Sequence, residues 1–441
     1  MRARLKSIAE TVTPNIGKHL SHVPFSLRLG AKYRSSVRDI AAWENASREF
    51  DDSYFKSLQA LVRFAFENID FYREFYKQKG FSPDDLSSMS DWSSVPIVTK
   101  TDFQSAPLES RCRQKPRGMK INTGGTSGQP LEFYIAPGAF AVEWAHMHYI
   151  WKLHGYKPQH LKITFRGKHF DSAEPLRYNA VHNEYIVNAS APMSQVTAAI
   201  LELSKGCVIR WLHGYPSLIA EFARQIEGGC FPGFSKFRAR LFGVLLGSEY
   251  PAPAYRSVIE RVISTHVVSW YGHSEMAILA RETALGVYES LPTYGYAEAV
   301  LAAEGGFNRL IGTSLHNRVH PFIRYDTGDL VQEVSKQSMS LGFQISEGRV
   351  GDFIVDRQGN RHSLTAIIFG RHHDAFDLIN HVQVRDQGGG VITLVITPRN
   401  TEVAMSELAQ GFNLVDLDME FQYEVVDSPI RTKAGKIQLK I

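Results

Sequence analysis

A glycine-rich loop at residues 122–130 is the first part of the sequence whose residue types suit chemistry. It reads N-T-G-G-T-S-G-Q-P and combines three glycines with hydroxyl and amide side chains. Glycine permits positive φ, so successive N–H groups can point into one concavity, and hydroxyls add further donors. The loop predicts a phosphate site whose members are Thr123, Gly124, Gly125, Thr126, Ser127 and Gly128.

Two common nucleotide motifs are absent from the sequence. Gln129 stands where a Walker loop would need lysine, and the G-x-G-x-x-G fingerprint of dinucleotide-binding folds does not occur. Clusters of Gly, Ser and Thr also form ordinary turns. The loop therefore indicates a phosphate site only in combination with the segments that follow it.

Four polar segments follow the loop in a fixed order. W-Y-G-H-S-E at 270–275 comes after the β-branched run 262–269, which we interpret as a buried strand. R-Y-D-T-G-D-L at 324–330 is expected to end a second strand, after Pro321. The last two segments are G-R-V-G-D at 348–352 and R-T-K-A-G-K at 431–436.

Taken together, the loop and these four segments resemble the core motifs of the adenylate-forming enzymes. Within that superfamily the chain is most similar to the phenylacetate-CoA ligases and their CapK-like relatives in capsule biosynthesis. The resemblance covers all but about the first tenth of the chain. The stretches that support this branch are 54–80, 95–100, 213–217 and 246–249.

The resemblance implies a nucleotide site built from the loop and from residues at strand ends. Tyr271 is expected to lie against the adenine ring. Asp329 is expected to accept hydrogen bonds from both ribose hydroxyls, a task that suits a carboxylate with two oxygens. The implied nucleotide-binding residues beyond the loop are Gly247, Ser248, Glu249, Tyr271, Gly272, Ser274, Arg324 and Asp329.

Acyl adenylation needs no general base, because a carboxylate is already ionised at neutral pH and attacks the α-phosphorus itself. The protein must absorb negative charge with N–H donors, Mg²⁺ and a mobile cation. The resemblance gives these catalytic roles to Lys436, Glu275 and Arg349, with Glu275 as the magnesium ligand. Without it, Lys436 would be an ordinary solvated lysine near the chain end.

The acid-binding pocket has the weakest signal. By family position it is expected to include His213, Tyr215 and His273, with Trp144 and His148 as further candidates on a helix after the loop. Each of these side chains could equally be core packing.

The pattern of elements predicts an α/β fold with a large N-terminal α/β domain, a β-rich subdomain and a small C-terminal α+β cap. Helical spacing over 51–80 and near 140–153, 193–203 and 216–226 alternates with strand-like runs at 161–165, 208–212 and 241–246. We expect a basic arm at 1–50, the large domain at 51–348 and the cap at 349–441. The resemblance implies that the cap rotates near Gly351.

Composition is that of an ordinary globular protein: 441 residues, 44% hydrophobic, 21% charged and a formal net charge of +4. This charge is too slight to argue for nucleic-acid binding. Three scattered cysteines, Cys112, Cys207 and Cys230, fit core thiols and neither a disulfide framework nor a zinc site. We expect a cytoplasmic protein; its oligomeric state is open, a homodimer included. The basic N-terminus could contact an anionic membrane, although packing on the large domain is favoured.

Three functions remain open at this point. The first is an ATP- and Mg²⁺-dependent ligase that forms an acyl-AMP from a small carboxylic acid and passes the acyl group to coenzyme A. The second delivers the same adenylate to an amine, in surface-polysaccharide synthesis. The third is a nucleotide-binding scaffold without turnover.

Overall fold

The computed structural model describes residues 12–45, 49–113, 117–122, 131–166, 168, 170, 173–249, 251–302, 308–337, 339–347, 353–359, 361–368, 373–399, 403–415, 417–431 and 437–441. The predicted phosphate loop at 123–128, Arg349, Gly351 and Lys436 lie outside these described residues.

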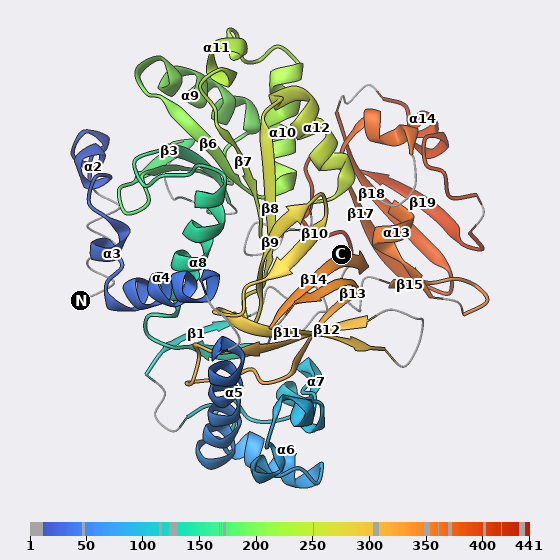
Figure 1. The fold of residues 1–441 in the computed structure, drawn as a ribbon. Helices are drawn as coiled ribbons and strands as arrows, with labels where there is room; N and C mark the ends of the chain where they lie inside the picture. The colour runs from blue at the N-terminus through green and yellow to red at the C-terminus, as the bar shows by residue number, and fades with distance from the viewer. Residues whose placement is uncertain are drawn as a thin grey trace. The chain divides into compact units, whose positions relative to one another are not determined.

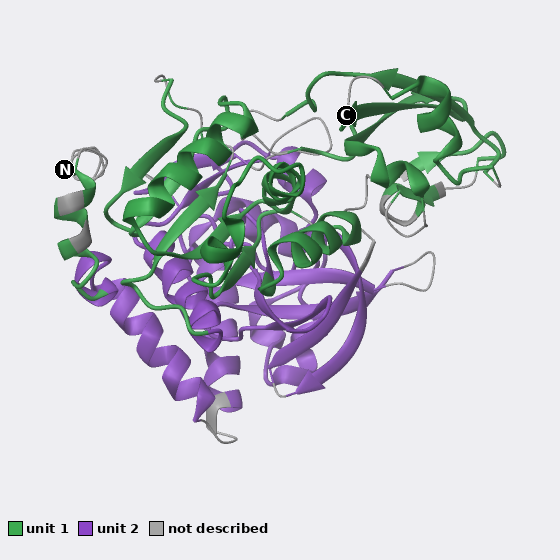
Figure 2. Cartoon of the chain, turned by 90° about the horizontal axis from the view of Figure 1, so that it is seen from above, with its two compact units in different colours: residues 1–24, 155–269, 351–441 green, residues 25–154, 270–350 purple. Residues whose placement is uncertain are grey.

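The chain forms two compact units, and each is built from separate pieces of sequence (Figure 2). Unit 1 contains Met1–Pro24, Gly155–Ser269 and Gly351–Ile441, and unit 2 contains Phe25–His154 and Trp270–Val350. The chain passes from unit 1 to unit 2 within a single strand, β8 (His266–Gly272). The division into arm, large domain and cap that the sequence predicts stays a prediction.

Unit 1 holds a mostly parallel sheet with the strand order β4-β5-β3-β6-β7-β8. Only β4 runs antiparallel to its neighbour β5 in this set. Parallel neighbours need crossover connections, and the helices α9, α10 and α12 supply them. The strands are β3 (Leu161–Phe165), β4 (Leu176–Asn179), β5 (Glu184–Val187), β6 (Ile209–Gly214) and β7 (Gly243–Leu246).

The helices of this sheet bury one apolar face each. α9 (Met193–Gly206), α10 (Pro216–Glu227) and α12 (Pro253–Ile263) share one core with alternate strand residues such as Ile163 and Phe165. Successive strand residues point to opposite faces, so Lys162 and Thr164 belong to the other face of β3. Pro216 starts α10 because its missing N–H costs nothing at the first helical position.

The C-terminal residues of unit 1 form a small domain with a core of its own. Its sheet has the order β17 (Ile379–Gly388), β18 (Val391–Pro398) and β19 (Glu420–Val425), visible at the red end of the chain in Figure 1. A hairpin of β15 (Phe353–Val355) and β16 (Arg361–Ser363) precedes it, and the helices are α13 (Leu364–Ile368) and α14 (Met405–Gln410). This is the small α+β domain that the sequence predicts.

Unit 2 holds an antiparallel sheet in the order β11-β12-β13-β14-β10-β9, and the last residues of β8 pair with β9. α5 (Glu49–Asn68) and α6 (Asp70–Gln78) pack in an aromatic core with α7 (Lys100–Gln104). The hairpin β1 (Met119–Asn122) and β2 (Glu132–Ile135) flanks the predicted loop. The sheet strands are β9 (Leu279–Ala284), β10 (Val287–Ser290), β11 (Gly295–Leu301), β12 (Asn308–Ser314), β13 (Tyr325–Gln337) and β14 (Ser340–Glu347).

The N-terminal helices of unit 2 pack against α8 (Ala139–Leu153). α4 (Ala31–Glu44) contributes Tyr33, whose hydroxyl lies 3.0 Å from Nδ1 of His148. α3 (Phe25–Arg28) contributes Phe25, whose ring stacks on the same histidine. This part of the basic arm therefore packs as a helix on the molecule, while residues 1–11 are not described.

Two boundaries differ from the sequence prediction. The strand expected from residue 262 begins only at His266, because α12 continues through Ile263 and ends at Ser264 in the left-handed conformation. The segment 324–330 does not end a strand: the long strand β13 begins within it, at Tyr325, and Pro321 lies in the irregular connection between β12 and β13.

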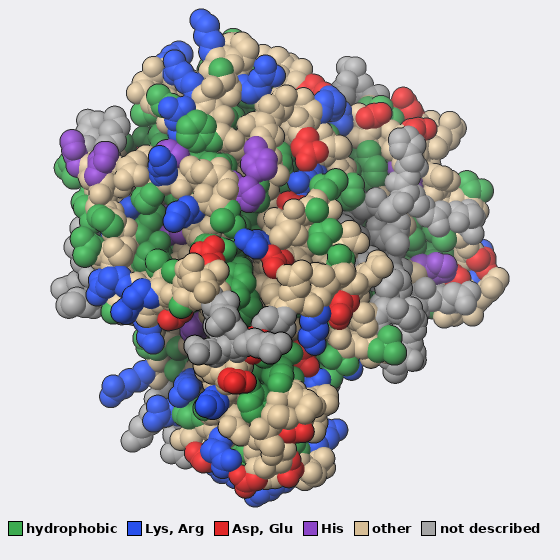
Figure 3. Space-filling view, in the orientation of Figure 1, with side chains coloured by type: hydrophobic (Ala, Val, Ile, Leu, Met, Phe, Trp, Pro, Cys, Tyr) green, Lys and Arg blue, Asp and Glu red, His purple; other side chains and the backbone are tan. Residues whose placement is uncertain are grey.

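Cationic and anionic side chains are interspersed over much of the face drawn in Figure 3. Cys112 is buried, but Cys207 is only half-buried and Cys230 is exposed, so the prediction of core thiols is wrong for Cys230, which follows the Gly-Gly end of α10. No helix within the described ranges is both long and apolar enough to cross a membrane.

Candidate functional site

Tyr271 and Asp329 form a direct pair in unit 2. The Tyr271 hydroxyl donates to Oδ2 of Asp329 over 2.5 Å, and both side chains are buried. Tyr271 lies at the end of β8 and packs edge-on against Phe343 of the same sheet. Two residues that the sequence assigns to adenine and ribose are therefore brought into contact.

An irregularity in β13 places Asp329. The β12 register jumps from Ile311 opposite Asp326 to Arg309 opposite Leu330, so the residues between bulge out of the ladder. Gly328 takes a φ of +78°, and its N–H donates to Oδ1 of Asp326. The T-G-D turn thus presents the Asp329 carboxylate beside the end of β8.

Glu275 is a buried carboxylate in the loop between β8 and β9. Its Oε2 lies 3.0 Å from Nδ1 of His273, and its Oε1 accepts a hydrogen bond from the Tyr325 hydroxyl at 3.3 Å. Its side chain is only 5% exposed, which would be costly for a carboxylate without such partners. The loop is therefore built to hold one oriented carboxylate.

This arrangement fits a magnesium ion of the kind that nucleotides carry. Mg²⁺ is bound through one or two carboxylates, with phosphate and water oxygens completing its shell. Glu275 would be the carboxylate ligand in such a site. The described residues contain no cluster of three or more His, Cys, Asp or Glu that could hold a metal by itself.

Arg324 has contacts of a different kind from those the motif implies. Its guanidinium pairs with Glu298 at 3.1 Å and donates to the backbone oxygens of Ser93 and Val95. Burial raises the pKa of Glu298, and the Arg324 charge opposes that rise. These contacts favour a structural role for Arg324, namely fastening the 93–95 segment to β11 through Glu298.

In unit 1, the segment after β7 closes on the start of α10. The Gly247 N–H donates to the oxygen of Gly214, and Ser248 is exposed with a φ of +69°. Oε2 of Glu249 accepts from both the hydroxyl and the N–H of Ser217, at 2.7 and 3.3 Å. Glu249 therefore satisfies a free donor at the helix N-terminus, where a negative charge is stabilised.

His213 belongs to a buried polar group on the face of the sheet opposite α10. Its Nδ1 lies 3.4 Å from the Thr164 hydroxyl, which donates to Glu184 at 2.6 Å. Lys162 pairs with the same carboxylate at 3.2 Å. Burial holds the pKa of His213 well below its ordinary value, so this imidazole is neutral at physiological pH. Tyr215 follows as the N-cap residue of α10.

The two remaining pocket candidates lie in unit 2. Trp144 is half-buried on α8 and contacts the rings of His148 and Trp151. His273 is the partner of Glu275 already described. Within unit 2 the structure pairs Tyr271 with Asp329 and His273 with Glu275, and within unit 1 it joins 247–249 to the start of α10.

Sequence reasoning missed three participants. Tyr325 lies inside the R-Y-D-T-G-D segment, and Ser217 lies inside H-G-Y-P-S. Both could therefore have been identified from these motifs. Glu221 follows Ser217 by four residues, the spacing that places two side chains on one helix face.

Comparisons with known proteins place this geometry in context. The chain is 23% identical over 395 residues to protein CapK of Staphylococcus aureus, covering 85% of each protein. It is 25% identical over 324 residues to phenylacetate-coenzyme A ligase of Escherichia coli (strain K12), covering 69% of this chain and 72% of that protein. No family model matches the chain.

Solved structures match over most of the chain. A 2-hydroxyisobutyryl-CoA ligase in the postadenylation state, in complex with R3-HIB-AMP, matches with a TM-score of 0.61 and 17% identity over 90% of both chains. The protein has the fold of the adenylate-forming ligases. GH3.15 acyl acid amido synthetase matches this adenylate-forming fold with a TM-score of 0.55 and 13% identity over 86% of both chains. The predicted α/β architecture and the resemblance to CapK and phenylacetate-CoA ligase are confirmed.

Proposed function

We propose that this adenylate-forming protein activates a carboxylic acid with ATP, releases pyrophosphate and transfers the acyl group to coenzyme A. The relatives that carry an activity in their names are CoA ligases and an acyl acid amido synthetase, one of them in a postadenylation state with an acyl-AMP compound, which supports this enzyme class. The observation that carries the proposal is the Tyr271–Asp329 pair, with buried Glu275 in the loop after the same strand.

Each residue has a role that suits the polarity or charge of the group that it contacts. Asp329 accepts hydrogen bonds from the ribose, and the Tyr271 hydroxyl holds that carboxylate in place. Glu275 holds Mg²⁺, which supplies neutralisation of the phosphate charge when bound. The substrate carboxylate attacks the α-phosphorus, the bond to pyrophosphate breaks, and no proton is removed.

Lys436, Arg349 and the loop 123–128 complete the proposal by resemblance. The loop N–H groups and hydroxyls would hold the β- and γ-phosphates. Lys436 would bridge the substrate carboxylate and the α-phosphate, because a flexible ammonium can follow both. The C-terminal domain would carry Lys436 in for adenylation and out for acyl transfer.

An amine is the alternative acceptor. GH3.15 acyl acid amido synthetase has this fold, so the fold is compatible with amide formation as well as with thioester formation. For coenzyme A as acceptor, a basic patch for its phosphates would draw on Arg361, His362, Arg371 and His372. His373, expected to join them, is buried, and its ring nitrogens contact the Ile367 oxygen and the Asn413 N–H, so it is not part of such a patch.

ATP–pyrophosphate exchange across a panel of carboxylic acids tests the proposal directly. An acid that supports exchange is then incubated with ATP and either coenzyme A or amines, and the product is identified by mass spectrometry. Exchange with none of the acids would favour the scaffold function instead.

Replacing the proposed catalytic lysine gives the first prediction. Lys436→Ala is expected to abolish exchange, because the charge that bridges carboxylate and α-phosphate is lost, while ATP binding by calorimetry stays nearly intact. Lys433→Ala, in the same segment, is the matched control. Undiminished exchange in Lys436→Ala would remove this lysine from the mechanism.

A further inference from the structure

One face of α10 carries a row of polar side chains that meet the C-terminal domain within unit 1. Ser217, Glu221, Arg224 and Glu227 follow one another at spacings of four, three and three residues, which places them on a single helix face. The opposite face, with Leu218, Ile219, Phe222 and Ala223, is part of the apolar core under the sheet. The polar face is therefore available for docking.

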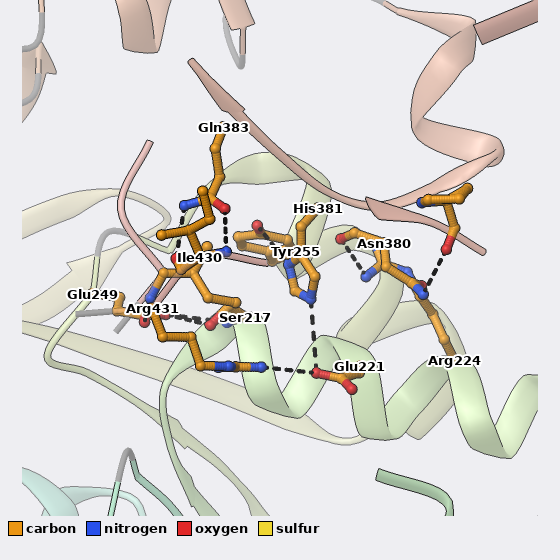
Figure 4. Close-up of polar contacts among 12 residues, drawn as sticks. Ser217, Glu221, Arg224, Glu249, Tyr255, Asn380, His381, Gln383, Ile430 and Arg431 are labelled. Carbon is orange, nitrogen blue, oxygen red and sulfur yellow. Dashed lines mark hydrogen bonds and ion pairs between the residues drawn. The ribbon is translucent and has the colours of Figure 1, made fainter. Parts of the chain in front are cut away.

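Two carboxylates on or beside this face contact residues that flank the Lys436 segment. Glu221 faces Arg431 at 3.6 Å and His381 at 3.7 Å, as Figure 4 shows. Glu249, bound to Ser217 at the start of the helix, accepts the backbone N–H of Ile437 at 3.3 Å through its other oxygen. One contact thus precedes residues 432–436 and the other follows them.

The C-terminal domain joins these two flanks on its own side. Arg431 and Ile437 form an antiparallel bridge with each other. Gln383 of β17, which is 1% exposed, donates to the oxygens of Ile430 and Gln438 and accepts from the Ile430 N–H. The residues on either side of the segment that contains Lys436 are therefore held next to each other by the bridge and by Gln383.

Further contacts along the helix fix the same arrangement. Arg224 donates to the oxygen of Asn380 at 2.9 Å, and Tyr255 of α12 lies 3.3 Å from Nδ1 of His381. Glu227 lies 3.9 Å from Arg399. Arg224 and Glu227 lie on the same face of α10, and α12 adds the contact of Tyr255.

We propose that Glu221 and Glu249 are positioning residues that anchor the base of the Lys436 segment to α10, and so set this segment for adenylation. The proposal rests on the proposed function. Glu249 links three parts of the machinery at once: the loop after β7, the N-terminus of α10 and the chain directly after Lys436. Because acyl transfer is expected to use another orientation of the small domain, these anchors should matter for the first half-reaction alone.

The second prediction follows from this. Glu249→Gln is expected to slow ATP–pyrophosphate exchange by about tenfold, the scale of losing one charge-assisted hydrogen bond. Glu221→Gln is expected to slow it by about threefold, because its contacts with Arg431 and His381, at 3.6 and 3.7 Å, are ion pairs longer than a hydrogen bond. Acyl transfer from preformed acyl-AMP should stay within about twofold of the unchanged protein in Glu221→Gln, whose residue is outside the implied nucleotide-binding set. Glu202→Gln, which neutralises a carboxylate 74% exposed on α9, is the matched control. Equal loss in both half-reactions would overturn the positioning role.

Reversing the charges of Glu221 and Arg431 together tests their ion pair. Glu221→Arg is expected to reduce exchange further, and the double variant Glu221→Arg with Arg431→Glu should recover part of the loss, because attraction between the two positions is restored. No recovery in the folded double variant would count against an anchor at this position.

Hydrogen–deuterium exchange gives a readout that does not depend on turnover. In the full chain without substrates, amides of the 437–441 peptide should exchange about tenfold faster in Glu249→Gln, and not in Glu202→Gln. Unchanged protection would overturn the anchor whatever the activity. Faster exchange in a protein that activates no acid would leave the anchor standing and remove the proposed function.

Discussion

The position of the Asp329 side chain is fixed by several local contacts. The bulge in β13 turns it out of the ladder, the Thr327 hydroxyl accepts its N–H, and the Tyr271 hydroxyl takes one of its two oxygens. One oxygen is thus engaged by the protein before any ligand arrives. The carboxylate is preorganised, which lowers the cost of orienting it on binding.

The third prediction concerns this pair. Asp329→Asn is expected to weaken ATP binding by about 1 to 3 kcal/mol, because an amide replaces a charged acceptor of two hydrogen bonds. Tyr271→Phe should weaken it less, by about 0.5 to 1.5 kcal/mol, because the carboxylate remains. Isothermal titration measures both, and Asp84→Asn, on an exposed side chain, is the control. Unchanged affinity in Asp329→Asn would leave Asp329 with a role in the turn alone.

At the scale of elements, the end of β6 is held unusually close to β3. Gly214 has a φ of +136°, and a Cβ at this position would lie 1.9 Å from the oxygen of Phe165. The same oxygen accepts the N–H of Tyr215, which starts α10. The helix that carries the proposed anchors therefore begins at a point where only glycine fits.

The fourth prediction uses this contact. Gly214→Ala is expected to destabilise the protein by about 3 kcal/mol or more, since both the backbone angle and the space oppose a methyl group. Gly155→Ala is the matched control, because its φ is also positive, at +89°, but nothing lies near the added carbon. It should cost about 1 kcal/mol. Urea unfolding midpoints compare the two, and equal midpoints would contradict the clash.

The sequence predicts elements well where periodicity is strong. The strand Leu161–Phe165 occurs where its alternation places it, and the helix expected at 216–226 is α10. The start of β8 could not be predicted, because Val262 and Ile263 suit a strand as well as a buried helix end. Helix α12 ends only at Ser264, which no spacing rule marks.

The site was predictable in residue types but not in pairings. Motif order gave Tyr271, Glu275 and Asp329, but it did not show that Tyr271 pairs with Asp329 or that Tyr325 of β13 donates to Glu275. Arg324 is the clearest example: its partner Glu298 lies on another strand, and no local spacing connects the two. Tertiary contacts of this kind require the folded chain.

At the scale of the whole molecule, buried histidines couple stability to pH. Burial lowers the pKa of His146 and of His320 to about 3 and also lowers the pKa of His316 and His381. The unfolded chain binds these protons near pH 6.5, whereas the folded chain does not. For His146 and His320 the stabilising contribution is therefore full above pH 6.5 and is lost as the pH falls towards about 3.

The fifth prediction tests one of these groups. His146 and His320 should each reduce the free energy of unfolding by about 1.4 kcal/mol per pH unit below pH 6. His320→Leu, in a site lined by Phe103, Phe133 and Phe322, should reduce the slope by that amount between pH 6 and pH 4.5. Urea unfolding at several pH values measures it, and His266→Leu, at an exposed position, is the control. Identical slopes in the His320 variant and the parent protein would refute the coupling.

The interleaving of the two units has a consequence for how the protein is made. A ribosome releases residues 25–154 well before residues 270–350, the other part of unit 2, because residues 155–269 of unit 1 lie between them. The aromatic core of unit 2 joins residues 54–139 to residues 277–339, so it cannot close until the second piece has been made. Apolar segments of the early pieces must therefore wait unprotected, which makes nascent chains dependent on chaperones and premature termination products prone to aggregate.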